Sequence, residues 1–415
     1  MTTQSAGPQT STGIGWLACL VLTTFIIGTD DFIIAGVLPA LAADLGVTEA
    51  AAGQLVTAFS LTYALGAWPL AVATARLPRK TLVVGGLTVF AGLNLLAAAS
   101  PSFAVLMVLR IVTAAVAAAI TPAVFAMAAR MAAPGKSGTA MGTVAAGLTV
   151  SLLVGVPLGS LIGDTWGWRA TFLAVALAAG VVILASMRLL PRIAGAAELT
   201  VAQQLRVLRK PAVLLCVTGT AIGASGGLML YTYIAPLTRD LTGHGGTALA
   251  FFIAVAGLAG AVGAVVGGRL NDQWGTDRAL LLTFTVLVVA AALLAGIGLL
   301  GQGSAPVWLV VAALVVWGIG GWGFNAPMNA RILGFAGDAG TQAVALNTSA
   351  LYVGTAVAGA MGGAAVALHG GVGVALAATA MCLLALGAMF LSVRLFPLPH
   401  PTKSPTPAGA GDVRS

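Results

Sequence analysis

Three ionisable side chains lie in stretches of sequence that are otherwise apolar: Asp30, Asp31 and Arg110. Two adjacent carboxylates in a low-dielectric medium cannot both ionise cheaply, because burial and like charge favour the protonated form, whereas a nearby guanidinium opposes this effect. A carboxyl group balanced between these influences can take up a proton on one side of a membrane and release it on the other. The three residues therefore indicate proton coupling; the alternative is an ion pair that only fixes how helices pack.

Asp30 and Asp31 are not expected to share one role. Successive residues of an α-helix point about 100° apart, so the two carboxyl groups face different neighbours. The sequence does not indicate which of them faces a cavity.

The elements that must position these residues are membrane-spanning helices. The chain has 415 residues, of which 59% are hydrophobic and 7% charged, with a mean hydropathy of +1.04. Soluble domains have about 45–50% apolar and about 25% charged residues, so a soluble enzyme and a nucleic-acid-binding protein are excluded. Apolar runs of roughly 20 residues mark spans. Such runs predict twelve spans, at 16–40, 51–75, 80–99, 103–130, 137–163, 168–190, 211–236, 247–268, 278–300, 306–331, 340–368 and 372–396.

The distribution of Lys and Arg predicts the orientation of these spans. With the N-terminus inside, sixteen of the 19 basic residues, Arg331 among them, fall in inner loops or the C-terminal tail, and only Arg169 and Arg239 fall in outer loops. Basic residues concentrate on the cytoplasmic side of membrane proteins, so both termini are expected in the cytoplasm. The same distribution explains the sequence pI of about 10.0 without nucleic acid as a partner.

A long basic connection divides the spans into two groups of six. We predict an N-terminal cytoplasmic tail at 1–15, a six-helix bundle at 16–190, a cytoplasmic connecting loop at 191–210, a second bundle at 211–396 and a disordered cytoplasmic tail at 397–415. The predicted fold class is an all-α membrane protein with two pseudo-symmetric bundles. This organisation is typical of transporters, whose site lies between the two halves near the midplane.

Small residues recur every four positions in the fifth span. The members of this stripe are Gly147, Ser151, Gly155, Gly159 and Gly163. Small residues at this spacing let another helix approach closely, and Pro157 inside the stripe should bend the helix. Similar stripes occur in the eighth and eleventh spans. We interpret them either as general membrane packing or as surfaces along which the two halves rock.

Polar and aromatic side chains inside the spans could line a mostly apolar cavity. Amides within a bilayer bond to another helix or to a ligand, and apolar pockets with few polar groups suit small neutral or amphipathic ligands. The candidates are Tyr63, Tyr231, Tyr233, Trp317, Trp322, Asn325, Asn329, Asn347 and Tyr352. Each could instead be a structural residue.

Other function classes lack their motifs. A Walker A lysine loop is absent, which argues against an ATP-driven pump, and no HExxH motif is present. Cys19, Cys216 and Cys382 lie in apolar runs and match no disulfide or metal-binding pattern. We therefore expect a monomer that is not an enzyme, needs no metal or cofactor, and uses a proton gradient as its driving force.

The sequence resembles the major facilitator superfamily, and within it the twelve-span drug:proton antiporters of the sugar-efflux and chloramphenicol-resistance branch. The resemblance covers 20–396 and is carried by Thr29-Asp30-Asp31-Phe32, Leu106-x-x-x-Arg110 and Gly155-Val-Pro157-Leu-Gly159. It places Asp31 at the family's acidic position and implies a part in proton transfer for Arg110. The third stretch resembles a signature found in exporters.

A family loop motif, Gly-x-Leu-x-Asp-x-x-Gly, is intact in the second half and degraded in the first. The gating residues that the resemblance implies are Arg76, Arg79, Lys80, Gly268, Asp272, Gly275 and Arg278.

The resemblance implies a proton-coupled antiporter of the bacterial cytoplasmic membrane that exports a small organic molecule, with chloramphenicol-like compounds as first candidates. Three alternatives stay open at this point: an exporter of sugars, nucleosides or other metabolites, a proton-symporting importer, and a membrane receptor or scaffold that does not transport.

Overall fold

A computed structural model of the chain describes residues 15–133, 136–195, 206–337 and 340–398, and these residues form helices and no strand. Eleven helical segments in these ranges are long and apolar enough to cross a membrane. Large apolar side chains such as Leu65, Leu177 and Val181 are exposed on the outside of the molecule. Such a surface is unstable in water and fits hydrocarbon. The chain is therefore a multi-pass membrane protein.

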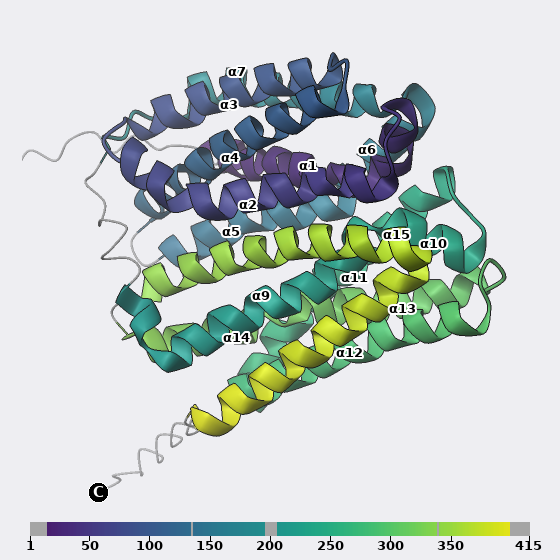
Figure 1. Ribbon diagram of the computed structural model, residues 1–415. Coiled ribbons are helices and arrows are strands. Elements are labelled where there is room, and N and C mark those ends of the chain that lie inside the picture. Colours follow the sequence, from purple (N-terminus) through teal and green to yellow (C-terminus); the bar gives the residue numbers. More distant parts are fainter. Residues whose placement is uncertain (1–14, 134–135, 196–205, 338–339, 399–415) are drawn as a thin grey trace, which may run out of the picture.

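The first part of the chain forms the upper group of helices in Figure 1, coloured purple to blue. We call residues 15–195 the N-terminal half. Its helices are α1 (Gly15–Asp44), α2 (Glu49–Thr74), α3 (Arg79–Ala98), α4 (Phe103–Met131), α5 (Ser137–Val150), the π-helical turn η1 (Ser151–Gly155), α6 (Val156–Trp166) and α7 (Trp168–Leu189).

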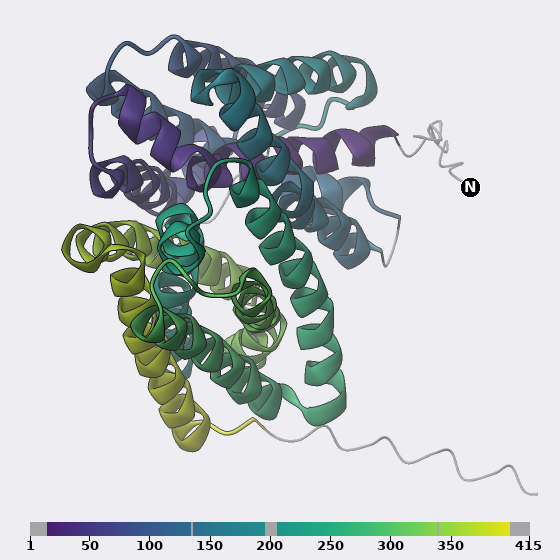
Figure 2. The same ribbon diagram turned by 90° about the vertical axis from the view of Figure 1, so that its right-hand side faces the viewer.

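The rest of the chain forms the lower group, coloured teal to yellow (Figure 1). We call residues 206–398 the C-terminal half. Its elements are the 3-10 turn η2 (Arg206–Arg209), α9 (Pro211–Thr232), α10 (Ile234–Thr242), α11 (Thr247–Trp274), α12 (Thr276–Leu300), α13 (Val307–Gly323), α14 (Asn325–Ala336) and α15 (Gly340–Leu395). The two groups stay distinct when the molecule is turned by 90° (Figure 2).

Proline explains three interruptions of the predicted spans. Proline has no N–H to donate to the carbonyl four residues earlier. Accordingly α9 ends four residues before Pro236, α13 ends four residues before Pro327, and the π-helical turn η1 directly precedes the helix that begins at Val156 and contains Pro157. The predicted irregularity of the fifth span at Pro157 therefore takes the form of a π-helical turn.

The last two predicted spans follow each other directly in α15, but the backbone is not helical throughout. His369 and Gly370 have non-helical dihedral angles, with φ of +60° at Gly370. Glycine adopts this left-handed conformation without steric cost. The kink coincides with the predicted boundary between the spans at 340–368 and 372–396. The exact count of six spans in each half, their pseudo-symmetry and the side of each terminus stay predictions.

Parts of the predicted organisation lie outside the described residues: the N-terminal tail up to residue 14, residues 196–205 of the connecting loop and the C-terminal tail from residue 399. The three cysteines, by contrast, are buried as free thiols.

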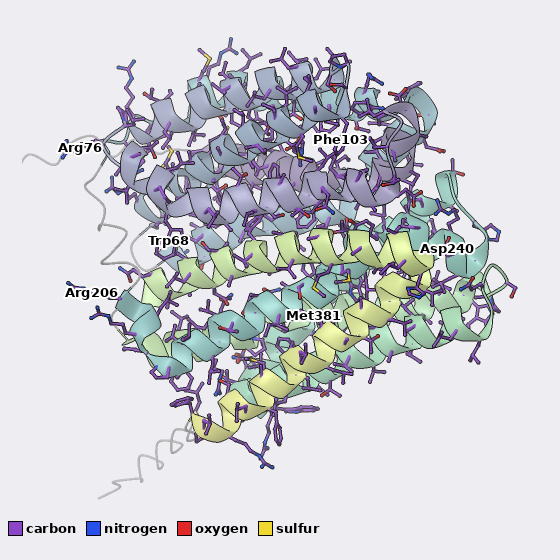
Figure 3. The ribbon with its side chains drawn as sticks, in the orientation of Figure 1. Trp68, Arg76, Phe103, Arg206, Asp240 and Met381 are labelled. Atoms are coloured by element: carbon purple, nitrogen blue, oxygen red, sulfur yellow. The ribbon has the colours of Figure 1, made fainter. Side chains whose placement is uncertain are left out.

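The two ends of the helix bundle are packed differently. Figure 3 shows Arg76 and Arg206 at one end, which we call the Arg76 end, and Asp240 at the other, the Asp240 end. Near the Asp240 end, residues of both halves share one apolar core, which includes Leu38, Leu237 and Ile253. Toward the Arg76 end, each half has a core of its own. The core that the two halves share thus lies at the Asp240 end.

Candidate functional site

Asp30 is held inside the N-terminal half. The Arg110 guanidinium on α4 donates to Asp30 Oδ2 at 2.7 Å and to the Asp30 backbone oxygen at 3.0 Å. The same guanidinium lies over the Phe59 ring, 4.3 Å from its centroid. Both charged side chains are fully buried, at 0% and 1% exposure. This geometry is that of an internal ion pair joining α1 to α4.

Asp31 faces the other half of the molecule. The Tyr352 hydroxyl on α15 donates to Asp31 Oδ2 at 3.0 Å. The Tyr352 ring stacks on Tyr63 of α2, with 3.9 Å between centroids and 21° between planes. Asp31 is 3% exposed. The adjacent carboxyl groups of Asp30 and Asp31 therefore have different partners, one within the N-terminal half and one across the two halves.

The acidic pair lies on α1 between the segments that pack in two different apolar cores. Ile26 and Ile27 pack in the N-terminal half's own core, and Ile33 and Ile34 pack in the core that both halves share. Asp31 lies between these two segments. It occupies the level at which the shared core gives way to two separate cores.

Four aromatic rings lie beside this level. Phe32 of α1 meets Tyr231 of α9 edge to face at 5.7 Å, and Tyr231 stacks on Trp317 with centroids 6.0 Å apart. Trp322 contacts both Tyr231 and Trp317. The Trp317 indole N–H donates to the Gly227 carbonyl at 3.2 Å. We call Phe32, Tyr231, Trp317 and Trp322 the aromatic cluster.

One polar atom of the aromatic cluster has no partner. The Tyr231 hydroxyl is buried, and in the described part of the chain it makes no hydrogen bond. A buried polar group without a protein partner is costly, so this hydroxyl can take part in binding a polar atom of a ligand. The structure thus brings five of the predicted pocket residues to the level of the acidic pair: Tyr63, Tyr231, Trp317, Trp322 and Tyr352.

The other predicted pocket residues bond to protein within their own half. The Asn347 amide donates to Asn329 at 3.0 Å and accepts from Thr220 at 2.5 Å, which ties together α15, α14 and α9. The Asn325 amide donates to the Trp322 carbonyl at 3.2 Å. The hydrogen bonds of these three asparagines therefore fit the structural role that the sequence analysis left open as the alternative to ligand binding.

Tyr233 lies away from the acidic pair, toward the Asp240 end. Its hydroxyl donates to the Gly359 carbonyl at 2.6 Å, and the Gln54 amide on α2 donates to the same carbonyl at 3.3 Å. Gly53 and Gly363 also border the Tyr233 ring. Tyr233 is therefore part of a tight contact between α2, α10 and α15.

An ion pair crosses between the halves at the Asp240 end. The Arg239 guanidinium donates to both Glu49 carboxylate oxygens, at 2.6 and 3.2 Å. Its hydrogen bonds to the Glu49 carboxylate raise the pKa of Arg239, with Asp240 adding to the effect. Asp240 in turn accepts from the Gly371 N–H at 2.7 Å. These contacts fasten α2 to α10 and to the kink of α15.

The glycine stripe of the fifth span packs on α1, within the same half. A side chain at Gly147 would meet Thr24 and the Val21 carbonyl, and one at Gly155 would meet Thr29. Gly159 and Gly163 face the next turns of α1, and Ser151 lies beside Gly28. The interpretation that this stripe marks a surface along which the two halves rock is therefore wrong.

Glycines at the contact between the halves lie elsewhere. Gly257 of α11 faces the Leu152 backbone in η1, and Gly359 of α15 faces Thr57 of α2. In the predicted stripe of the eighth span Gly260 faces Trp322, and in that of the eleventh span Gly354 faces the Ala221 carbonyl, so both lie against their own half. Small residues thus serve both kinds of contact, and their spacing alone does not separate them.

The predicted gating residues lie at the Arg76 end or on the helices that reach it. Lys80 Nζ donates to the Met187 carbonyl at 2.7 Å, and Arg79 is buried, with its N–H bonded to the Ile193 carbonyl. Arg76 is exposed. In the second half, Asp272 accepts from the Asn271 amide. The remaining members are Gly268, Gly275 at the end of α11 with φ of +83°, and the exposed Arg278.

Sequence reasoning missed an ion pair between the buried Arg331 and the partly buried Asp277. Arg331 was expected in an inner loop, but it belongs to α14 and is 0% exposed. Its guanidinium bonds to Asp277 of α12 and donates to the carbonyls of Ser392 and Phe396, at 2.8 and 2.7 Å. The apolar residues that flank Arg331 were the signal that could have revealed it.

A surface groove of about 700 Å³ lies apart from the acidic pair, between α12 and α13. Its lining is apolar, for example Leu293, Ile297 and Leu309. None of its lining residues is charged.

The amino-acid sequence is similar to those of known transport proteins of one superfamily. The sequence profile of the Major Facilitator Superfamily matches residues 20–342. The chain is 31% identical over 344 residues to the uncharacterized MFS-type transporter YbcL of Bacillus subtilis (strain 168), which covers 83% of this chain and 87% of that protein. It is 32% identical over 346 residues to a chloramphenicol resistance protein of Streptomyces lividans, covering 82% of this chain and 86% of the relative.

Solved structures share the fold. A bacterial homologue of the human lysosomal transporter Spinster, in an inward-facing and unoccupied conformation, aligns with a TM-score of 0.72 at 17% identity. The alignment covers 92% of this chain and 97% of that one.

Proposed function

The chain belongs to the Major Facilitator Superfamily, and we propose that this transporter is a proton-coupled antiporter that exports a small organic molecule across the bacterial cytoplasmic membrane. In the proposed mechanism, two six-helix bundles alternate between access to one side and access to the other. The relative YbcL is named an MFS-type transporter, which supports transport as the general activity.

The observation that carries this proposal is the position of Asp31. Its carboxyl group is buried, bonds to Tyr352 of the opposite half, and lies where the shared core gives way to two separate cores. A carboxyl group at this level changes its surroundings whenever the halves move against each other. A change of surroundings is what allows it to take up a proton on one side and release it on the other.

The predicted orientation assigns a direction to this cycle. Basic residues concentrate at the Arg76 end, which supports its placement in the cytoplasm. With the Asp240 end closed by the shared core and by the pair of Glu49 and Arg239, the described arrangement would be closed toward the outside. Cargo would then bind from the cytoplasm while Asp31 is ionised, and an external proton on Asp31 would favour the return.

The aromatic cluster supports an aromatic or amphipathic cargo. It combines aromatic rings with one hydroxyl, that of Tyr231, that has no protein partner among the described residues. Pockets for small organic ligands combine apolar walls with a few polar groups in this way. The name of the Streptomyces lividans relative makes chloramphenicol the first compound to test.

The test is transport into everted membrane vesicles, in which the cytoplasmic face of the membrane is outside. With an acidic lumen, the wild type should accumulate radiolabelled chloramphenicol, and Asp31→Asn should abolish this accumulation. Asp44→Asn is the matched control, because Asp44 lies on the same helix but is exposed and pairs with Arg169. The control should accumulate the compound as the wild type does.

Two outcomes would contradict the proposal. Accumulation only under the opposite gradient would make the protein an importer. Full gradient-driven accumulation by Asp31→Asn would remove Asp31 from proton coupling.

A further inference from the structure

Two aromatic side chains are exchanged between the halves along the contact of α2 with α15. Tyr352 of α15 packs in the core of the N-terminal half. Among the described buried residues of that core, it is the one that comes from the C-terminal half. Trp68 of α2 packs in the core of the C-terminal half and donates to Ser349 Oγ at 2.6 Å. Figure 3 shows Trp68 between the two groups of helices. We call this contact the α2–α15 seam.

Tyr352 differs from Trp68 because its polar atom reaches an ionisable group. Its hydroxyl is 3.0 Å from Asp31 Oδ2, and its ring is fixed by stacking on Tyr63 at 3.9 Å. The ring is 8% exposed and cannot turn away without leaving the core. A phenylalanine would keep the stack and lose the bond to Asp31.

We propose that Tyr352 is the positioning residue that links the charge of Asp31 to the α2–α15 seam, so that the seam is held firmly only while Asp31 is ionised and no cargo is bound. The inference rests on the proposed function of Asp31 as the proton carrier. An ionised carboxylate forms a charge-assisted bond with the hydroxyl, which is roughly twice as strong as a neutral one. A proton on Asp31 weakens the bond, and a cargo that takes the hydroxyl's place removes it.

This link would prevent an empty and unprotonated transporter from changing the side to which it is open. A carrier that changes its access while empty lets cargo run downhill without a proton. The bond between Tyr352 and Asp31 restrains that empty, ionised state. The proton and the cargo each release the restraint by acting on the same bond.

Of the charged and titratable groups around Asp31, none other is expected to change its protonation near neutral pH, so Asp31 is the group that responds to pH. They are Asp30 and Arg110 within the half, Tyr63 on α2, Tyr231 on α9 and Tyr352 on α15. Tyrosine ionises near pH 10, about three units above neutrality, and arginine stays charged in proteins. Asp30 is already paired with Arg110.

The experiment measures the seam directly. Spin labels are placed at Ala73 of α2 and Ala345 of α15, which are exposed near the Arg76 end, after Cys19, Cys216 and Cys382 are replaced by alanine. Distances between the labels are recorded by electron spin resonance in lipid nanodiscs, without cargo, at alkaline and acidic pH. For the wild type we expect one narrow distance distribution at alkaline pH and a broader or longer one at acidic pH.

Tyr352→Phe should show the acidic-type distribution at both pH values. Its vesicles should still equilibrate chloramphenicol downhill but should lose at least half of the accumulation driven by the pH gradient. Tyr233→Phe is the matched control, because it also loses a hydroxyl bonded to α15 but one that reaches only the Gly359 carbonyl. It should keep the wild-type response of the seam to pH.

A wild-type pH response in Tyr352→Phe would overturn the inference. If Asp31→Asn has lost its pH response in the same experiment, the proposed function of Asp31 stands and only the role of Tyr352 fails. If Asp31→Asn also responds to pH as the wild type does, both fail.

Discussion

Removal of the Arg110 guanidinium should destabilise the protein far more than removal of an exposed guanidinium does. Arg110→Met leaves the Asp30 carboxylate fully buried without its cation, and it also removes the contact with the Phe59 ring. Breaking a buried ion pair from one side costs about 3–5 kcal/mol. We expect a loss of this size in the free energy of unfolding.

The assay is equilibrium unfolding of the purified protein in mixed detergent micelles, followed by tryptophan fluorescence. The control is Arg169→Met, which breaks the exposed pair with Asp44 and should change the free energy of unfolding little or not at all. The double variant Asp30→Asn/Arg110→Met removes both charges and should regain more than half of the lost stability. It should also keep pH-driven transport, because Asp31 and Tyr352 are untouched.

The reasoning would be refuted by an Arg110→Met variant as stable as Arg169→Met. It would also be refuted by a stable double variant that no longer couples transport to pH, since Asp30 and Arg110 would then belong to the proton pathway itself.

Two further predictions concern packing and the Asp240 end. Gly147→Ala should cost about 1–3 kcal/mol in the same unfolding assay, because its new methyl group would meet Thr24 and a backbone carbonyl of α1; Gly142→Ala, on the same helix in open space, should be neutral or stabilising by up to about 1 kcal/mol. Glu49→Gln should cost less than about 1 kcal/mol, because Arg239 is 46% exposed. High salt should remove most of that difference, since it screens exposed charges, and a loss that persists in high salt would contradict this reading of the Glu49 contact.

Local patterns predicted much of the molecule. The apolar runs located the spans, because a helix must be long and apolar to cross hydrocarbon. The unusual cost of charge in that setting singled out Asp30, Asp31 and Arg110, and these residues do lie together. The change of direction between successive helical residues also predicted that the two aspartates face different neighbours.

The remaining features depend on contacts between distant segments. The partner of Asp31 is Tyr352, 321 positions away on the other half, and no local periodicity specifies that pairing. The glycine stripe of the fifth span shows the same difficulty, because its spacing predicts a close approach but does not say which helix approaches. Arg331 was predicted to lie in a loop, because basic residues at the end of a span usually mark its cytoplasmic side. The folded chain instead buries Arg331 next to Asp277.

The central claim is that Asp31 exchanges a proton for cargo, and the most direct measurement is proton release on cargo binding. Purified protein in a weakly buffered detergent solution is titrated with chloramphenicol while a pH indicator reports released protons. The wild type should release protons in a saturable way that follows binding, and Asp31→Asn should bind the compound without releasing any. Equal proton release from wild type and Asp31→Asn, or binding to the wild type with no release at all under conditions where the free protein carries the proton, would contradict the account.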